Sequence, residues 1–127
     1  MPRPFTPDER AILEFLIDDR VPNAAILRQQ LATAEYAQPW YDGTMCFDIA
    51  VSPDAPRFEL TAREAFPIVV SSVYSRADTR SPADYAAEIS LWVEGGVMTG
   101  VEYSQAAEEE PTEWPSVDTM QLELGRD

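Results

Sequence analysis

The sequence predicts an α+β fold in which two N-terminal helices pack on one face of an antiparallel sheet of four to five strands. Near the N-terminus, apolar residues recur at helical spacing, whereas in several later segments they alternate with polar residues. A Gly-Gly pair between two alternating segments is typical of a tight hairpin turn. With 127 residues the chain fits one domain, residues 1–127, with the helix stripes and one sheet face as its core.

The two helices are expected at about residues 7–19 and 23–33. Thr6 can cap the first helix, and Glu9 stands three residues later, as in a capping box. A proline at the first helical position strengthens this start. A Val-Pro pair breaks the first helix, and Asn23 can cap the second.

The strands are expected at about 44–51, 66–75, 85–94 and 97–105. Asp42-Gly43 before the first strand is a hairpin signal. Residues 106–127 contain prolines and show no clear periodicity. We therefore expect an extended tail there, which docks through Trp114, Met120 or Leu122.

The sequence around the Gly95-Gly96 turn predicts an irregularity in the pairing of the two hairpin strands. With a two-residue turn and regular pairing, Val101 and Tyr103 would fall on the wrong face of the sheet. One extra residue at Thr99-Gly100 corrects this, so a β-bulge is predicted there. The bulge places six apolar residues on one face: Ile89, Leu91, Val93, Met98, Val101 and Tyr103. The opposite face then carries Trp92 with Glu88, Glu94 and Glu102.

The composition argues against most catalysis. The chain has no histidine and no lysine, and its nine basic residues are all arginine. A serine or cysteine nucleophile usually needs a histidine or lysine base, and a structural zinc site needs several cysteines or histidines. Cys46 is the single cysteine and is interpreted as a small, semi-buried strand residue. We predict no enzyme activity, no cofactor and no metal.

One catalytic alternative survives this composition. Glycoside hydrolysis needs only a pair of carboxylates, and Glu88, Glu94 and Glu102 are the candidates. Trp92 beside them could stack on a sugar ring. A carboxylate-based hydrolase is therefore kept as the lesser alternative.

Charge and hydropathy predict where the protein is located and which classes of partner it does not bind. The first residues lack the apolar segment of a signal peptide, and no apolar run approaches a membrane span, so a cytoplasmic protein without membrane contact is expected. Nucleic-acid binding needs a basic face, which nine dispersed arginines in an acidic chain do not predict.

Part of the chain resembles a known group of proteins. The residues concerned are the TPDERAILEFL opening, Leu91-Trp92-Val93, the glycine turn, Met98 to Tyr103 and Pro111 to Pro115. In this order they resemble a family of small bacterial α+β proteins without an assigned activity. The resemblance covers about half the chain and implies no catalytic or binding residue.

The acidic residues are concentrated near the C-terminus. Residues 84–127 carry eleven acidic residues and one arginine, which accounts for −10 of the net charge of −14. Salt adaptation is one explanation of such an excess. The other is a binding module for a basic protein, of the kind that neutralises or chaperones its partner (immunity-type). The predicted partner-binding residues are Trp92, Glu88, Glu94, Glu102 and Trp114. The alternative is a small accessory or homo-oligomerising domain without ligand chemistry, whose strands pair across a two-fold axis.

Overall fold

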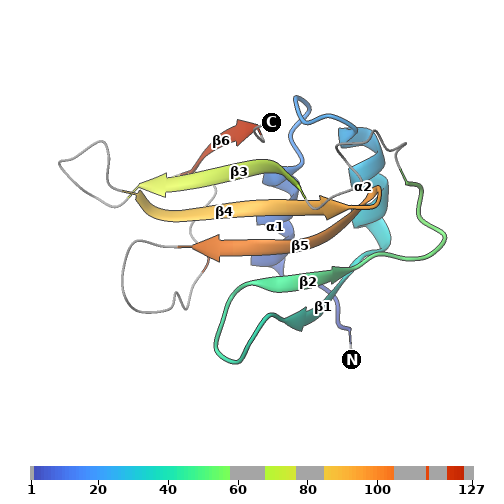
Figure 1. Ribbon diagram of the computed structural model, residues 1–127, viewed down its shortest axis with the longest axis horizontal. Helices are drawn as coiled ribbons and strands as arrows, with labels where there is room; N and C mark the ends of the chain where they lie inside the picture. Colours follow the sequence, from blue (N-terminus) through green and yellow to red (C-terminus); the bar gives the residue numbers. More distant parts are fainter. Residues whose placement is uncertain (1, 58–67, 77–84, 105–113, 115–119, 125–127) are drawn as a thin grey trace.

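The computed structural model describes residues 2–57, 68–76, 85–104, 114 and 120–124, and it has the predicted α+β class (Figure 1). Helices α1 (Pro7–Leu16) and α2 (Ala24–Thr33) both lie behind the sheet in this view. The strands are β1 (Glu35–Pro39), β2 (Phe47–Ala50), β3 (Ile68–Arg76), β4 (Tyr85–Glu94), β5 (Val97–Ser104) and β6 (Met120–Leu124). They form one sheet in the order β1-β2-β5-β4-β3-β6, in which all neighbours are antiparallel.

The helices begin where the sequence indicates, but α1 ends earlier. Thr6 and Glu9 form the predicted capping box, in which the Thr6 side chain accepts from Glu9 N at 3.2 Å. Instead of continuing to residue 19, α1 ends at Leu16, because Ile17 leaves the helical conformation and its carbonyl accepts a hydrogen bond from Arg28 at 2.8 Å. Asn23 precedes α2 in the left-handed conformation (φ 63°), and its side chain makes no capping hydrogen bond.

Both edges of the sheet come from segments where no strand was predicted. β1 follows α2 directly and pairs with β2 across the turn that contains Asp42-Gly43. β6 lies within the predicted tail, 106–127, and pairs with β3 at the opposite edge. Both strands are five residues long, and β1 ends in a proline, so neither has a strong local signal. Their pairing with long neighbouring strands provides the hydrogen bonds that the local sequence does not indicate.

The predicted β-bulge is confirmed. Gly95 and Gly96 both have positive φ angles (65° and 86°), as a primed hairpin turn requires. Val93 pairs with Met98, whereas Trp92 pairs with Gly100, so Thr99 is the extra residue. All six apolar residues expected on one face are buried: Ile89, Leu91, Val93, Met98, Val101 and Tyr103. We call the face that carries them the inner face.

The inner face packs on the two helices. α1 contacts β3 and β4, and α2 contacts β5. Ser71 on β3 donates a hydrogen bond from Oγ to the carbonyl of Leu16 at 2.7 Å, which satisfies a free carbonyl at the C-terminal end of α1. The buried apolar residues of both layers form one continuous cluster. The other side of the sheet, turned away from the helices, is called the outer face below.

A buried glutamine fixes α2 to the glycine hairpin. The Gln30 side chain is fully buried, and its Nε2 donates to the carbonyls of Pro56 and Gly96, both at 2.9 Å. Its Oε1 accepts from Met98 N at 3.0 Å. One side chain therefore satisfies three backbone groups, and the hydrogen bonds to Gly96 and Met98 are buried. This contact sets the position of the β4–β5 turn relative to α2.

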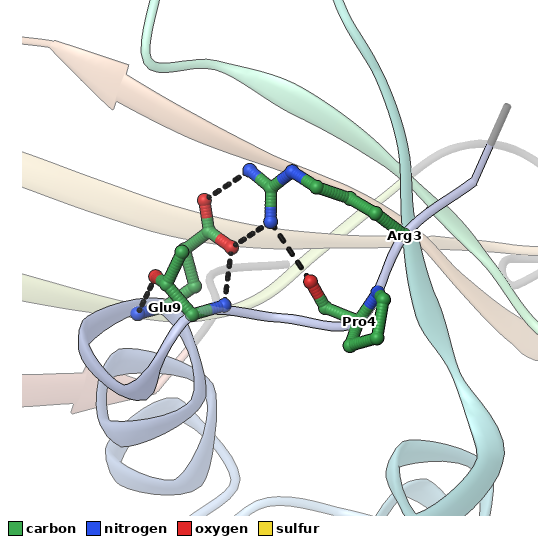
Figure 2. Close-up of polar contacts among 4 residues, drawn as sticks. Arg3, Pro4 and Glu9 are labelled. Carbon is green, nitrogen blue, oxygen red and sulfur yellow. Dashed lines mark hydrogen bonds and ion pairs between the residues drawn. The ribbon is translucent and has the colours of Figure 1, made fainter.

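The N-terminal segment is fixed by one arginine (Figure 2). Arg3 forms a two-pronged pair with the Glu9 carboxylate, with both nitrogen–oxygen distances 2.9 Å, and donates to the carbonyl of Pro4. Its guanidinium lies 3.8 Å from the ring centroid of Tyr36 on β1. Burial alone would raise the pKa of Glu9, but hydrogen bonds from Arg3 and from the backbone of Thr6 outweigh it and lower the pKa below its usual value.

None of the helices in the described part of the chain has the length and apolar character needed to cross a membrane.

The Arg3–Glu9 pair predicts a pH-dependent stability difference. Because its pKa is lowered on folding, the Glu9 carboxylate stabilises the protein above its unfolded pKa, and this stabilisation is lost as the pH falls through the folded pKa. Glu9→Gln is expected to lower the free energy of unfolding by about 1–2 kcal/mol at neutral pH and by much less in acid. This value allows for the partial exposure of Arg3, because solvent weakens the ion pair. Urea denaturation at several pH values measures this.

The matched control is Glu14→Gln on the same helix. The Glu14 side chain is 63% exposed and lies 4.0 Å from Arg10, so we expect a loss below about 0.5 kcal/mol at every pH. A deficit of Glu9→Gln that does not change with pH would show that the ion pair is not its cause.

Candidate protein-binding face

The outer face carries one row of paired residues that crosses five strands. Each residue in the row is the direct partner of the next, from β1 across β2, β5 and β4 to β3. The row consists of Gln38, Asp48, Gly100, Trp92 and Val69. The bulge at Thr99 creates this arrangement, because it brings Gly100 instead of a residue with a side chain opposite Trp92.

The structure brings the predicted Trp92 and its glutamates onto this one face. Trp92 is half-buried, and its indole Nε1 donates to Glu102 Oε1 at 3.1 Å. Glu88 pairs with Ser104 and is half-buried, and Glu94 is exposed at the end of β4. The cross-strand hydrogen bond between Trp92 and Glu102 orients both side chains.

Trp114 lies on the other side of the sheet from Trp92. Its ring packs edge-on against Phe47, with ring centroids 6.0 Å apart, and lies 5.1 Å from the ring of Tyr103. Both neighbours are buried residues of the core cluster. Trp114 and Leu122 both pack against the core, as expected for the tail, while the side chain of Met120 lies outside the described residues. The five predicted partner-binding residues therefore do not form one surface.

Trp40 is a candidate that the sequence analysis did not identify. It follows β1 in the hairpin loop, where its backbone N–H donates to the carbonyl of Cys46 at 3.1 Å. A Cβ atom built on Gly100 would lie 3.5 Å from Trp40 Nε1 and 3.7 Å from its Cζ2. The edge of the Trp40 indole therefore lies over Gly100, at a distance that a Cβ atom there would meet as an ordinary contact.

The hairpin tip is also the most exposed apolar part of the described residues. Trp40 is 41% exposed, and the next residue, Tyr41, is 53% exposed. Asp42-Gly43 is a turn signal in the sequence, but no local pattern indicates that the preceding Trp40 folds back over the sheet. A hint existed in Gly100, because a glycine inside a strand often marks a close approach by another group.

Three of the acidic residues on this face take no part in the salt bridges within the described part of the chain. No salt bridge there involves Asp48, Glu94 or Glu102, and β2, β4 and β5 contain no arginine. The four ion pairs found among the described residues all involve residues of the helices or of the segments next to them. Asp48, Glu94 and Glu102 therefore place three carboxylates without a described salt bridge on the face that carries Trp92.

Cys46 and the acidic residues are also the candidates for thiol chemistry and for metal binding. Cys46 is buried, and its sulfur accepts from Tyr103 N at 3.2 Å, so the side chain takes part in the contact between β2 and β5. Among the described residues, no group of three or more acidic, cysteine or histidine side chains is placed to hold a metal ion. The arrangement offers flat aromatic surface and carboxylates, which suits recognition of a cationic surface.

Comparison of the chain with family models, with curated proteins and with solved structures yields no match. The resemblance to small bacterial proteins stays a prediction.

The close fit at Gly100 predicts a destabilising substitution. A Cβ atom at this position would lie 2.9 Å from the backbone oxygen of Phe47, a contact that cannot relax without moving a strand. We expect Gly100→Ala to lower the free energy of unfolding by about 1–3 kcal/mol, measured by urea denaturation.

Gly95→Asn is the matched control. Its positive φ angle (65°) is one that asparagine tolerates, and no atom lies within 4 Å of the added Cβ, so a change below about 1 kcal/mol is expected. Equal stability of the Gly100→Ala variant and the unmodified protein would contradict the close packing of Trp40 and β2 on Gly100.

Proposed function

We propose that the protein is an acidic protein-binding module whose outer sheet face binds a basic protein, in the manner of an immunity protein or a chaperone that neutralises its partner. The single observation that carries this proposal is the clustering of Asp48, Trp92 and Glu102 on a face whose strands β2, β4 and β5 contain no arginine. Trp92 and Glu102 are predicted partner-binding residues, and we propose Asp48, which lies in the same row as Trp92, as a third.

The charge of this face supports the proposal through association kinetics. The carboxylates of Asp48, Glu94 and Glu102 have no salt bridge within the described residues, so their field is not cancelled nearby. Complementary fields raise the rate at which charged partners meet, and salt weakens the effect. Binding to a basic surface would therefore be fast at low ionic strength.

The aromatic residues supply the short-range part of the contact. Trp40 and Tyr41 are exposed, the Trp40 indole lies over Gly100, and the strand partner of Gly100 is the half-buried Trp92. Tryptophan, tyrosine and arginine are enriched among the residues that dominate the energy of protein interfaces, and the two aromatic residues bury large areas at low entropic cost. A face that combines aromatic rings with carboxylates suits a partner rich in arginine or lysine.

The hydrolase alternative is less well supported by the geometry. Glu88 and Glu102 lie on neighbouring strands and are diagonal to each other, because Glu88 pairs with Ser104 and Glu102 with Ser90. One of the two carboxylates is already bonded to an indole. Glycosidases hold a sugar between two carboxylates, whereas these two side chains project from the same sheet face.

The accessory or homo-oligomerising alternative is favoured by a different feature, the edge strand β6. At the other edge, Arg3 and Tyr36 exchange two backbone hydrogen bonds of 2.9 and 2.8 Å, so the N-terminal segment covers part of β1. Among the described residues, β6 pairs with β3 alone. Pairing of β6 with a second copy would produce a dimer that light scattering detects, and a monomer at working concentration would eliminate this alternative.

Neutralising the outer face tests the proposed function. The immobilised protein is exposed to a bacterial lysate at low and high salt, and the retained proteins are identified. We expect basic proteins to be retained at low salt only, and replacement of Glu88, Glu94 and Glu102 by glutamine to abolish this retention. With a retained protein purified, the same variant should slow association about threefold or more, because it removes steering charges.

The control variant changes the net charge equally, at exposed positions in α1 and in the loop after β2: Asp8→Asn, Glu14→Gln and Asp54→Asn. It should retain the same proteins as the unmodified chain. Retention that is indifferent to salt, or lost equally in both variants, would count against the outer face as the binding surface.

A further inference from the structure

Trp40 is held on the sheet by one edge while much of its surface stays open to solvent. The indole rests above Gly100 through Nε1 and Cζ2, yet the residue is 41% exposed. Its indole N–H has no hydrogen-bond partner among the described residues. A tryptophan fixed in this way presents a surface to a ligand without losing much conformational freedom on binding.

Two carboxylates adjoin the same glycine-centred site from opposite sides. Asp48 is the β2 partner of Gly100, and its Oδ2 accepts a hydrogen bond from Gln38 Nε2 at 3.0 Å. On the β4 side, Trp92 pairs with Gly100 and holds Glu102 through its indole. Both carboxylates are oriented by neutral donors, and each has further lone pairs that can accept hydrogen bonds from a cationic ligand.

The protein already binds one of its own arginines with these two kinds of contact. The guanidinium of Arg3 lies 3.8 Å from the ring centroid of Tyr36 and pairs through two nitrogens with the Glu9 carboxylate (Figure 2). A planar guanidinium can stack on a ring and bind a carboxylate in its plane at the same time, whereas a lysine ammonium is a compact, strongly hydrated charge.

Resting on the proposed function, we infer that the site around Gly100 recognises an arginine side chain of the basic partner, in preference to lysine. The guanidinium stacks on the exposed surface of Trp40 and pairs with the carboxylate of Asp48 or Glu102. Trp40 and Asp48 are thereby specificity-determining residues, whereas Glu94 contributes only charge. Net charge alone would not distinguish arginine from lysine, so the preference is the property that sets this inference apart.

Short synthetic peptides test the inference directly. The probes are an unstructured peptide of alternating arginine and serine, its lysine counterpart and its glutamate counterpart. Affinities are measured by calorimetry at low salt, and binding is located by NMR from the three indole N–H signals, assigned with single Trp→Phe variants. We expect the arginine peptide to bind about three- to tenfold more tightly than the lysine peptide, and the glutamate peptide not to bind.

The NMR signals have an internal control. The arginine peptide should shift the signals of Trp40 and Trp92 on the outer face and leave that of Trp114 unchanged, because Trp114 packs against the core on the other side. A shift confined to Trp114 would overturn the inference.

Substitutions at the site separate stacking from charge. Trp40→Ala and Asp48→Asn should each lower the affinity for the arginine peptide about three- to tenfold and lower the affinity for the lysine peptide by less. Trp40→Phe should retain part of the preference for the arginine peptide over the lysine peptide. Glu94→Gln, which removes an equal charge from the same face, should lower the affinities for the two peptides by the same factor. Thermal denaturation of each variant verifies that it is folded, and the exposure of Trp40 makes its replacement tolerable.

The outcomes distinguish this inference from the proposed function. Equal affinity for the arginine and lysine peptides, unaffected by Trp40→Ala, would overturn arginine recognition and leave a basic partner bound by charge alone. Binding of neither peptide would also overturn it, whereas the salt-dependent retention of basic proteins decides the proposed function separately.

Discussion

The extra residue at Thr99 is the local constraint on which the two faces of this sheet depend. Without it, the alternation along β5 would place Val101 and Tyr103 on the outer face and expose apolar side chains to water. With it, both residues are buried against the helices, and Gly100 lies opposite Trp92. One unpaired residue therefore completes the core and creates the site where Trp40 rests.

The two faces solve different physical problems. The inner face must bury apolar area, and it does so against α1 and α2, with Gln30 and Ser71 satisfying the backbone groups that become enclosed. The outer face contains aromatic rings and carboxylates held by hydrogen bonds to neutral donors. The arginines of the described ion pairs lie in or next to the helices, whereas Asp48, Glu94 and Glu102 form no ion pair among the described residues.

The described contacts of Arg3 and Arg28 show how arginine side chains connect separate segments of this protein. Arg3 joins the N-terminal segment, α1 and β1 through a carboxylate and a ring, and Arg28 closes the end of α1 through the carbonyl of Ile17. These contacts use the planar geometry of the guanidinium, which lysine lacks. A partner arginine at Gly100 would meet the same kind of environment on the outside of the sheet.

The sequence alone determined the elements with strong local signals. The capping box of Thr6 and Glu9, the Gly95-Gly96 turn, the bulge and the sharing of one face by Trp92, Glu88, Glu94 and Glu102 follow from spacing within a few residues, where hydrogen-bond geometry leaves little choice. The early end of α1, the edge strands β1 and β6, and the burial of Trp114 away from Trp92 depend on contacts between distant segments. Only the tertiary structure placed Trp40 over Gly100, because nothing local to a hairpin loop specifies the strand on which its side chain comes to rest.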